Sequence, residues 1–595
     1  MFVDHGVERS SEKPAEMSEH ATASKWLRSF EDALRACDRE ALMSCFGAEC
    51  HWRDMLAFSW DIAPHDDQQS IVDDLIKYQP RVNARSFQVA YGRTPPRRVR
   101  RLGNEVIEAI FSFETDAARC DGVLRLPLGD PGRAWVFSSS ITELKGHEEP
   151  ILQRRPTGIA YSRNFGGANW SDLRSAEQAF ADREPTVLII GGGQAGITLA
   201  ARLRLLGVDT LVIERKGRIG QVWSDRYHSL ALHNQVAINH LPYIPFPPNW
   251  PKYLPKDMLA KFLEFYAWAM ECNVWTNTTF ITGNYDEEKA AWSATVSLND
   301  GTIRVLHPRH LVFANGVAGG KKIPDLPGLA DFEGEVLHTD DYYSGAKYKG
   351  KRVLVVGTGT SGHDCAQDLH GHDAKVGIIQ RGSTTVVSVE AAAFNNTVHY
   401  QENIPTEDAD LIGTAATFQL LQRGYQLNVK KMKEHDKALL DGLRARGFKL
   451  DFGPDEAGHQ MKLRSRHGGY YLNCGCSELI VSGEIGLLQW EEAQRFVKDG
   501  LLMKDGRIEK ADIVVAATGY HPQEEVVRQL LGEEISRKVG PIWGLADNGE
   551  LRNMFGPTPQ RGLWFLGGGL SQSRVYSHYL ALQIKARELG LVEER

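Results

Sequence analysis

Hydrophobic positions change their period within the first quarter of the chain. Between residues 26 and 34 the apolar side chains recur at the spacing of one helical face, whereas residues 105–114 and 134–142 alternate with a period of two. Helices followed by strands predict an α+β domain, which we place over residues 23–150. Residues 1–22 carry only isolated apolar side chains, so we predict a disordered tail there.

Two later segments share one pattern, in which an apolar run is followed by a glycine turn and a helix. The turns are Gly191-Gly-Gly-Gln-Ala-Gly196 and Gly357-Thr-Gly-Thr-Ser-Gly362. In GxGxxG the first glycine permits the tight turn, the second lets the backbone approach a pyrophosphate, and the third lets the helix lie close to the strand. We therefore predict an α/β fold with two Rossmann-like dinucleotide-binding domains. The candidate cofactor-binding residues in these turns are Gly191, Gly193, Gln194, Ala195, Gly196, Gly357, Gly359, Thr360, Ser361 and Gly362.

The residues that follow the next strands differ in charge. Glu214 stands eighteen residues after Gly196, where a carboxylate accepts hydrogen bonds from ribose hydroxyls and repels a 2′-phosphate. Arg381 stands nineteen residues after Gly362, where a guanidinium would pair with a 2′-phosphate, unless it is only a solvated strand end. We predict FAD or NAD at the first turn and NADPH at the second. Two such sites in one chain predict hydride transfer from NADPH to a tightly held FAD.

The two motifs set the predicted domain boundaries. The stretch after the second turn is longer than a Rossmann crossover needs, and its helical pieces, residues 411–427 and 436–446, are predicted to supply substrate contacts. Lys462, Arg464 and Arg466 alternate there, which predicts a strand face that is solvated or that orients an acidic substrate. The predicted boundaries are 151–184 for a linker, 185–345 for the first part of the FAD-binding domain, 346–520 for the NADPH-binding domain with a helical insertion over about 393–472, and 521–595 for the return segment of the FAD-binding domain.

Composition and charge narrow the functional classes. The 595 residues carry 69 Lys+Arg against 76 Asp+Glu, a formal net charge of −7, so no overall basic field favours nucleic acid or an anionic membrane. The N-terminus has no apolar signal region, and no apolar run approaches the ~18 residues that span a bilayer. The eight cysteines show neither the spacing of a metal site nor the CxxC of disulfide reductases. We expect a cytoplasmic protein that binds no metal, membrane or nucleic acid.

A third motif stands between the two glycine turns. Phe332-Glu-Gly-Glu-Val-Leu-His338-Thr-Asp-Asp-Tyr342 reads FxGxxxHxxxY, and here the sequence resembles the class B flavin monooxygenases, which include flavin-containing monooxygenases, YUCCA enzymes and Baeyer–Villiger monooxygenases. Residues 512–520 end in ATGY, similar to the family's second inter-domain motif, and residues 220–223 are similar to its GG-x-W segment. Asn315 departs from the family, which usually has Thr in its first inter-domain motif. The resemblance covers residues 185–595 and adds Gln221, Val222, Trp223, Thr518 and Gly519 to the candidate cofactor-binding residues.

The resemblance implies a monooxygenase that uses FAD, NADPH and O2. In such enzymes NADPH reduces FAD, O2 adds to the flavin C4a, and the resulting peroxyflavin transfers one oxygen atom to a small organic substrate while water is kept out. Both N- or S-oxygenation and Baeyer–Villiger-type carbonyl oxygenation stay open. From the residues alone two other classes also stay open: an NAD(P)H oxidase or pyridine nucleotide-disulfide oxidoreductase, which the cysteine spacing disfavours, and a non-enzymatic nucleotide-binding sensor.

The resemblance also implies two candidate catalytic residues. Many flavin-containing monooxygenases have an Asn near an NLP segment that contacts flavin and NADP+, and here Asn239 and His240 precede Leu241-Pro242. His240 could donate a hydrogen bond to the peroxide oxygen, or it could satisfy a backbone group of its own loop.

The N-terminal domain resembles another family. Residues 46–62, FGAECHWRDMLAFSWDI, are similar to a segment of the SnoaL-like and ketosteroid-isomerase-like cone fold, and the resemblance covers residues 24–148. Such a cone is either a catalytic pocket, with His51 and Asp54 as acid/base groups, or a docking and dimerisation module, which we favour. With a module of this kind, a homodimer is a reasonable expectation.

Overall fold

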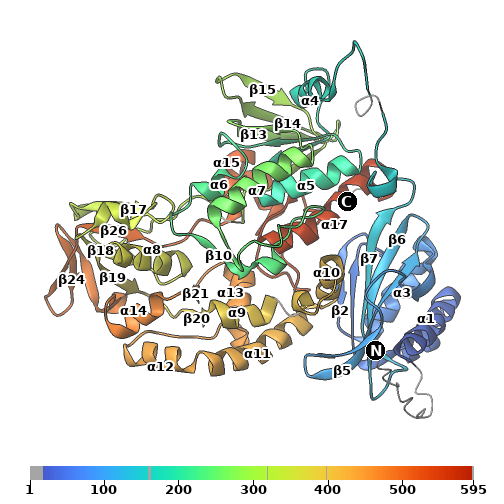
Figure 1. Cartoon of the computed structure of the whole chain (residues 1–595), viewed down its shortest axis with the longest axis horizontal. Coiled ribbons are helices and arrows are strands. Elements are labelled where there is room, and N and C mark those ends of the chain that lie inside the picture. The colour runs from blue at the N-terminus through green and yellow to red at the C-terminus, as the bar shows by residue number, and fades with distance from the viewer. Residues whose placement is uncertain (1–17, 159–162, 318, 397–398, 593–595) are drawn as a thin grey trace, which may run out of the picture. The chain divides into compact units, whose positions relative to one another are not determined.

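The chain forms two compact units in the computed structural model (Figure 1). The first unit consists of the residues up to Lys145 together with Glu407–Thr417, and the second consists of Gly146–Thr406 and Phe418–Arg595. No helix among the described residues is both long and apolar enough to cross a membrane. The structure describes residues 18–158, 163–317, 319–396 and 399–592.

The first unit begins with a helix that starts earlier than predicted. Of the predicted tail, residues 1–17 lie outside the described residues, but α1 (Glu19–Ala36) takes in the rest. Ser18 accepts a hydrogen bond from the backbone N–H of Ala21 at 3.2 Å, so a serine cap begins the helix. The apolar stripe recognised in the sequence is buried, with Leu27 and Phe30 fully inaccessible. The other helices at the start of this unit are α2 (Arg39–Ser44) and α3 (Gln68–Val82).

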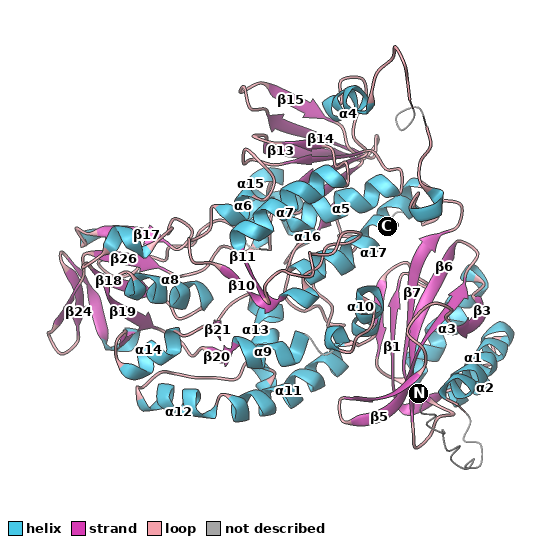
Figure 2. Ribbon diagram, viewed as in Figure 1, coloured by secondary structure: helices cyan, strands magenta, loops and turns pink. Residues whose placement is uncertain are grey.

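These helices cover one face of a seven-stranded sheet (Figure 2). Its strand order is β2-β1-β7-β6-β5-β3, with β4 also paired to β5, and only the β1–β7 pair is parallel. The opposite face carries α10 (Thr406–Thr414), whose residues come from far along the chain. The strands are β1 (Phe46–Met55), β2 (Ile62–His65), β3 (Arg85–Val89), β4 (Arg97–Arg101), β5 (Asn104–Glu114), β6 (Ala118–Pro127) and β7 (Ala134–Leu144).

The second unit contains two parallel five-stranded sheets. The first sheet has the order β12-β9-β8-β16-β27, and β27 returns to it from near the C-terminus. Helix α5 (Gln194–Leu205) packs between α7 (Lys256–Ala269) and α17 (Leu570–Glu588), as Figure 1 shows. The strands are β8 (Val187–Ile190), β9 (Thr210–Ile213), β12 (Val274–Trp275), β16 (His310–Phe313) and β27 (Leu563–Phe565).

The second sheet has the order β17-β26-β18-β19-β22. Here the structure differs from the predicted boundary between residues 345 and 346, because β17 pairs with β26 of this sheet although it was assigned to the first part of the FAD-binding domain. The FxGxxxHxxxY motif therefore begins the second sheet. The elements are β17 (Glu335–His338), β18 (Arg352–Val356), α8 (Thr360–Gly371), β19 (Lys375–Gln380), β22 (Gly486–Gln489) and β26 (Ile513–Ala516).

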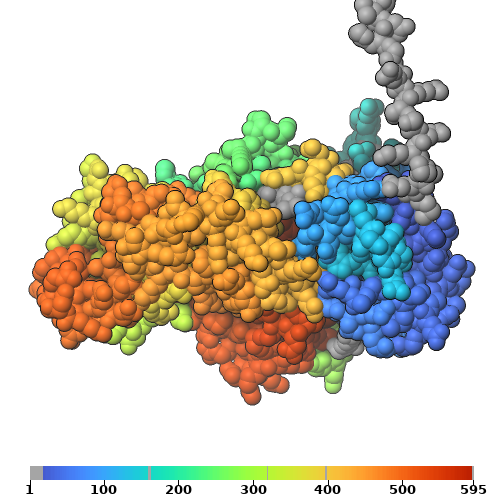
Figure 3. Space-filling model, turned by 90° about the horizontal axis from the view of Figure 1, so that it is seen from below, coloured from blue at the N-terminus to red at the C-terminus, as the bar shows by residue number. Residues whose placement is uncertain are grey.

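Small sheets and further helices complete the second unit. The helices α11 and α12 make up much of the face that Figure 3 shows in light orange. The strands are β10 (Ala231–Gln235) with β11 (Tyr253–Pro255), β13 (Thr279–Asp286), β14 (Ala291–Ser297) and β15 (Ile303–Leu306), β20 (Thr385–Ser388) with β21 (Tyr470–Asn473), and β23 (Ala493–Val497), β24 (Gly500–Met503) and β25 (Ile508–Lys510); the helices are α6 (Gln221–Ser224), α9 (Val389–Asn396), α11 (Phe418–His435), α12 (Lys437–Ala445), α13 (Gly458–Arg466), α14 (Cys476–Ser482), α15 (Gln523–Leu531) and α16 (Glu533–Val539).

Two expectations for the predicted insertion were wrong. The helix predicted over residues 411–427 is broken, because α10 ends at Thr414 and α11 begins at Phe418, and the two parts belong to different units. The alternating cations of residues 462–466 lie on α13 and not on a strand. Lys462 is 3% exposed and donates to Asp451 at 2.5 Å, so it forms a buried ion pair and not a solvated face.

The segment predicted as a linker, residues 151–184, contains the helix α4 (Trp170–Ala179). Asn169 and Asp172 form a capping box, in which each side chain accepts a hydrogen bond from the other residue's backbone N–H at 3.0 Å. A capping box starts a helix by satisfying its first N–H groups. Sequence analysis missed this helix because few apolar residues mark one of its faces. The two residues of its capping box, however, can be recognised in the sequence.

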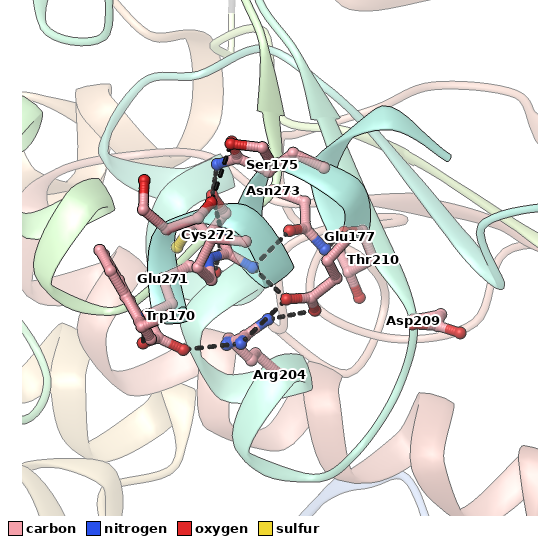
Figure 4. Close-up of polar contacts among 12 residues, drawn as sticks. Trp170, Ser175, Glu177, Arg204, Asp209, Thr210, Glu271, Cys272 and Asn273 are labelled. Atoms are coloured by element: carbon pink, nitrogen blue, oxygen red, sulfur yellow. Dashed lines mark hydrogen bonds and ion pairs between the residues drawn. The ribbon is translucent and has the colours of Figure 1, made fainter. Parts of the chain in front are cut away.

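A cluster of charges holds α4 to the rest of the second unit (Figure 4). Arg204 of α5 donates to Glu177 of α4 at 2.6 Å and to Glu271 at 2.7 Å. The indole N–H of Trp170 donates to the same Glu271 at 2.6 Å. Arg174 adds a hydrogen bond to Asn273 at 2.9 Å. The helix is therefore part of the second unit and not a free connection.

Candidate functional site

The first glycine turn is pressed against the end of the neighbouring strand. Gly191 has φ +109°, and a Cβ atom there would lie 2.7 Å from the carbonyl oxygen of Ala314. A Cβ at Gly196 would lie 2.0 Å from the carbonyl oxygen of Gly191. Any side chain at either position would overlap backbone, so packing alone requires both glycines.

The second turn repeats this arrangement. Gly357 has φ +116°, and its Cβ would lie 2.4 Å from the carbonyl oxygen of Ala517, while a Cβ at Gly362 would lie 2.2 Å from the Gly357 oxygen. Ala314 and Ala517 are the first residues of Ala-Asn-Gly and Ala-Thr-Gly, the two inter-domain motifs. The first residue of each inter-domain motif therefore packs directly against one glycine turn.

The middle glycines differ, and they test whether a dinucleotide fits. A Cβ at Gly193 would meet nothing within 4 Å, and one at Gly359 would meet only the carbonyl oxygen of Tyr470 at 3.9 Å. Protein packing thus leaves space above both residues, which are the N-caps of the twelve-residue helices α5 and α8. The N-terminus of a helix offers backbone N–H groups and a positive potential to a phosphate. Both turns fit the pyrophosphate of a dinucleotide.

Glu214 lies beside the first turn with its carboxylate held in place. One oxygen accepts a hydrogen bond from the backbone N–H of Gly192 and the other from that of Lys216, each at 2.8 Å. The carboxylate is therefore oriented by the turn itself, within reach of a nucleotide that binds there. Glu214 is partly exposed.

Arg381 follows β19 and is exposed. Among the described residues its guanidinium has no hydrogen bond or ion pair. A hydrogen bond holds the chain just after Arg381 to the second glycine turn, since the hydroxyls of Thr384 and Thr358 lie 2.7 Å apart. A fixed turn with one unpaired cation beside it can accept a 2′-phosphate.

Two candidate residues of the first turn region contact each other. The indole N–H of Trp223 donates to Gln194 at 3.2 Å, and the Gln194 amide donates to the carbonyl oxygen of Gly568 at 3.1 Å. The GG-x-W segment, the glycine turn and the C-terminal return segment thus meet at Gln194. Sequence analysis did not identify Gly568, although it belongs to the run of three glycines before α17.

The remaining candidates are more dispersed. Gln221 accepts from the backbone N–H of Gly217 at 3.1 Å, Thr360 donates to the carbonyl oxygen of Tyr470 at 3.2 Å, and Thr518 donates to that of Lys322 at 2.5 Å. Their side chains thus hold local backbone. Ala195 is buried inside α5, Ser361 is partly exposed on α8, and the Val222 residue is 46% exposed.

Asn239 and His240 are held within their own loop. Asn239 is 2% exposed, and its amide donates to the carbonyl oxygens of Asn234 and Gln235 at 3.1 and 3.2 Å. His240 Nδ1 accepts from the backbone N–H of Phe246 at 3.0 Å, so its proton is on Nε2. The ring of Phe246 in turn stacks on Trp250 at 5.1 Å. An apolar wall therefore flanks this loop.

Arg574 binds the backbone of this loop, and sequence analysis did not identify it. It lies on α17, is 4% exposed, and donates to the carbonyl oxygens of Ile238 and His240 at 2.9 and 2.6 Å. A second nitrogen donates to the hydroxyl of Tyr400 at 3.3 Å. No sequence motif marks Arg574, because the carbonyls that it binds are 334 and 336 residues away.

The FxGxxxHxxxY motif has a structural role at this site. His338 is inaccessible, and its Nε2 donates to the carbonyl oxygen of Gly519 at 3.0 Å. A Cβ at Gly334 would lie 2.4 Å from the carbonyl oxygen of Asp512. Tyr342 donates its hydroxyl to Asp368 of α8. The motif thus binds the ATGY segment and the helix of the second turn.

The candidate acid/base groups of the first unit, His51 and Asp54, are engaged in hydrogen bonds. Asp54 is fully buried and accepts from the hydroxyls of Ser59 and Ser139, at 2.7 Å each, as well as from three backbone N–H groups. Burial raises the pKa of Asp54 to about 6. His51 lies 2.6 Å from Asp66 through its Nδ1. Both groups orient backbone and neighbours.

The first unit has a core rich in aromatic rings. Phe137 lies 4.9 Å from Phe30, 5.2 Å from Phe111 and 6.2 Å from Phe46, measured between ring centroids, and all four side chains are inaccessible or nearly so. Phe87 and Phe113 stack at 4.6 Å. Rings packed at these separations form a close-packed aromatic core.

Comparisons with known proteins show which family this chain is similar to. Residues 185–407 match the family model described as pyridine nucleotide-disulphide oxidoreductase. The probable indole-3-pyruvate monooxygenase YUCCA3 of Arabidopsis thaliana is 32% identical over 342 residues, which cover 56% of this chain and 72% of that protein. The indole-3-pyruvate monooxygenase YUCCA1 of Oryza sativa subsp. japonica is 30% identical over 354 residues, 59% of this chain and 80% of that protein.

The chain belongs to the class B flavin monooxygenases. A crystal structure of cyclohexanone monooxygenase with bound ε-caprolactone shares the fold of this flavin monooxygenase, with a TM-score of 0.50 and 16% identity over 68% of this chain and 88% of that one. The predicted family is confirmed.

The activity of the protein follows from its membership of the class B flavin monooxygenases. The protein is an FAD-dependent monooxygenase that uses NADPH and O2. We therefore reject the alternative functions, namely an NAD(P)H oxidase, a disulfide oxidoreductase and a non-enzymatic sensor. All eight cysteines are free in the structure, so the disulphide in the name of the family model has no counterpart here.

Proposed function

We propose that this flavin monooxygenase oxygenates a small carbonyl compound, with an aromatic α-keto acid as the first candidate. The relatives reported above are named indole-3-pyruvate monooxygenases, and indole-3-pyruvate is an aromatic α-keto acid. That naming carries the proposal. The reaction would be R–CO–COOH + O2 + NADPH + H+ → R–COOH + CO2 + NADP+ + H2O.

We place FAD at the first glycine turn and NADPH at the second. Support for the first placement is the Glu214 carboxylate, which two backbone N–H groups hold beside the open N-terminus of α5 and which disfavours a 2′-phosphate. Support for the second is the exposed Arg381. Bound at the first turn, FAD would supply the redox chemistry, namely acceptance of a hydride from NADPH and transfer of electrons to O2. The chain's residues bind the two nucleotides, fix their orientation and exclude water.

Asn239 and His240 are the proposed catalytic residues. Because Nδ1 of His240 accepts the Phe246 N–H, Nε2 is the nitrogen that donates a proton in a hydrogen bond. The rings of Phe246, Trp250 and Phe262, 4.8 to 5.4 Å apart, form the apolar wall that keeps water from this loop. Arg574 fixes the loop backbone through two carbonyl oxygens.

For the first unit we propose a SnoaL-like module without catalytic function. Its aromatic interior and the satisfied carboxylate of Asp54 support a docking role. A homodimer and a cytoplasmic location stay predictions.

A substrate panel tests the proposed reaction. The purified FAD-loaded enzyme is given NADPH, 18O2 and either indole-3-pyruvate, phenylpyruvate, cyclohexanone or methyl phenyl sulfide, and products are followed by mass spectrometry. We expect the α-keto acids to yield the shortened acid with one 18O atom and one CO2 per NADPH. Product from the sulfide alone would contradict the proposal and favour heteroatom oxygenation.

A further inference from the structure

Helix α10 is bound to the sheet of the first unit at its N-terminal end by charge. Asp408, whose side chain is 1% exposed, accepts from Arg93 at 2.9 Å, from the Thr94 backbone N–H at 2.7 Å and from the Thr94 hydroxyl at 2.6 Å. Hydrogen bonds that involve charged groups and exclude water are among the stronger contacts in a protein. Asp408 therefore anchors the start of this helix.

The other end of α10 is held through its carbonyl groups. Arg53 donates to the carbonyl oxygen of Thr414 at 2.9 Å, and Arg125 donates to that of Ile412 at 3.1 Å. Both arginines are less than 5% exposed. The last carbonyls of a helix have no partner within it and carry a partial negative charge, so buried cations suit them.

One of these two arginines, Arg125, also belongs to a buried charge cluster of the sheet. Glu108, with a side chain that is 1% exposed, pairs with Arg97, Arg101 and Arg125. One carboxylate thus faces three guanidinium groups. The Ile412 carbonyl oxygen of α10 is a further acceptor for Arg125 of this cluster.

A short stretch of chain joins α10 to residues that lie next to the proposed catalytic loop. Just before it, in the second unit, Gln401 donates to Gln235 at 3.2 Å and Tyr400 accepts from Arg574 at 3.3 Å. Arg574 holds the carbonyl oxygen of His240. Only residues 402–405 separate Gln401 from the first residue of α10.

We propose that the first unit is an intramolecular clamp: by binding residues 407–417 it holds Tyr400 against Arg574 and thereby keeps the hydrogen bonds that fix the Asn239–His240 loop. Asp408 and Arg93 are then positioning residues for the monooxygenase reaction. Release of the segment loosens the loop and admits water, so reduced enzyme consumes O2 without oxygenating substrate. This role is independent of which substrate the enzyme takes.

Uncoupled turnover tests the clamp without an organic substrate. The full-length holoenzyme is given NADPH and air, and the reaction NADPH + H+ + O2 → NADP+ + H2O2 is followed through NADPH absorbance and peroxide. We expect Asp408→Ala and Arg93→Ala each to raise peroxide release about 2- to 30-fold, and the double variant to add little. The matched control is Glu407→Ala, an exposed neighbour on the same helix, for which we expect the wild-type rate.

Two measurements separate the clamp from general damage. Bound FAD, read from its visible spectrum, should be unchanged in Asp408→Asn, the milder variant, while its peroxide release still rises. Hydrogen exchange on the wild-type protein should show the amides of residues 409–414 as slow as the core strands of the first unit. Rapid exchange there, or variants with wild-type peroxide release, would overturn the proposal. Absence of any NADPH oxidation in the wild type would count against the monooxygenase assignment instead.

Discussion

His338 donates a hydrogen bond from Nε2 to the carbonyl oxygen of Gly519 at 3.0 Å, while its Nδ1 accepts from the backbone N–H of Asp340 at 3.1 Å. The histidine of FxGxxxHxxxY is thereby fastened to the glycine of ATGY, and both of its nitrogens are satisfied in an inaccessible site.

We expect His338→Ala to lower the free energy of unfolding by about 1–3 kcal/mol, because it leaves the buried Gly519 carbonyl and Asp340 N–H without partners. The midpoint of urea unfolding, followed by flavin fluorescence, measures this. The control is His521→Ala, an exposed histidine nearby in sequence. Equal midpoints for both variants would contradict a structural role for His338.

The first and second glycines of a turn should respond differently to a methyl group. Gly193→Ala adds a Cβ that meets no protein atom within 4 Å, so the variant should fold with nearly wild-type stability and yet bind FAD about 10-fold or more weakly. Gly191→Ala places a Cβ 2.7 Å from a backbone oxygen at φ +109°, so it should fail to fold or unfold at much lower temperature. Thermal unfolding of the apoproteins and FAD titration measure both effects. Tight FAD binding by Gly193→Ala would show that no phosphate approaches that residue.

Arg381 should determine the preference between the two nicotinamide cofactors. We expect Arg381→Ala to raise KM for NADPH about 10- to 100-fold with little change for NADH, since only NADPH carries the 2′-phosphate that pairs with a guanidinium. Lys375→Ala, an exposed cation at the start of the same strand, is the matched control and should change neither KM. A loss shared equally by NADPH and NADH would argue against a 2′-phosphate contact.

Asp54 should make the stability of the first unit depend on pH. Burial raises its pKa from an ordinary 3.8 to about 6, so the folded protein binds this proton more tightly than the unfolded chain does. The stability that protonation confers is complete below pH 4 or so and is lost as the pH rises towards 6, by about 3 kcal/mol in all.

The difference in unfolding free energy between the wild type and Asp54→Asn, measured from about pH 4.5 to 7, isolates this effect because other carboxylates titrate in both proteins. We expect the wild type to lose stability relative to the variant over that range. A constant difference would show that the five hydrogen-bond donors around Asp54 keep its pKa at an ordinary value.

Local pattern was enough to predict the parts of the fold that depend on a few adjacent residues. The strand, glycine turn and helix at Gly191 and at Gly357 are found as expected, because φ above zero and close backbone contact leave glycine as the residue that fits. The helix α4 was missed since a polar cap, and not an apolar face, begins it. We assigned the strand β17 to the first sheet, whereas it pairs with β26 of the second. The sequence of a four-residue strand does not determine which sheet the strand joins.

Contacts between distant residues were beyond sequence reasoning. Arg574 carries no motif, and its role depends on carbonyls of a loop more than 300 residues earlier. The residues of α10 read as part of a longer helix over 411–427, but their partners are buried arginines of the first unit. Such pairs are decided by charge balance inside the folded unit, which no short segment reveals.

The placement of α10 has a consequence for how the protein is made. Arg53 and the Thr414 carbonyl that it binds are 361 residues apart, so a ribosome must synthesise more than two thirds of the polypeptide before the first sheet meets its last element. Until then Arg53 and Arg125 lack the α10 carbonyl oxygens to which they donate in the folded unit, and the nascent sheet lacks the helix that covers that face. A truncated gene product that stops at residue 145 should accordingly precipitate or recruit chaperones, although it contains every strand of its sheet.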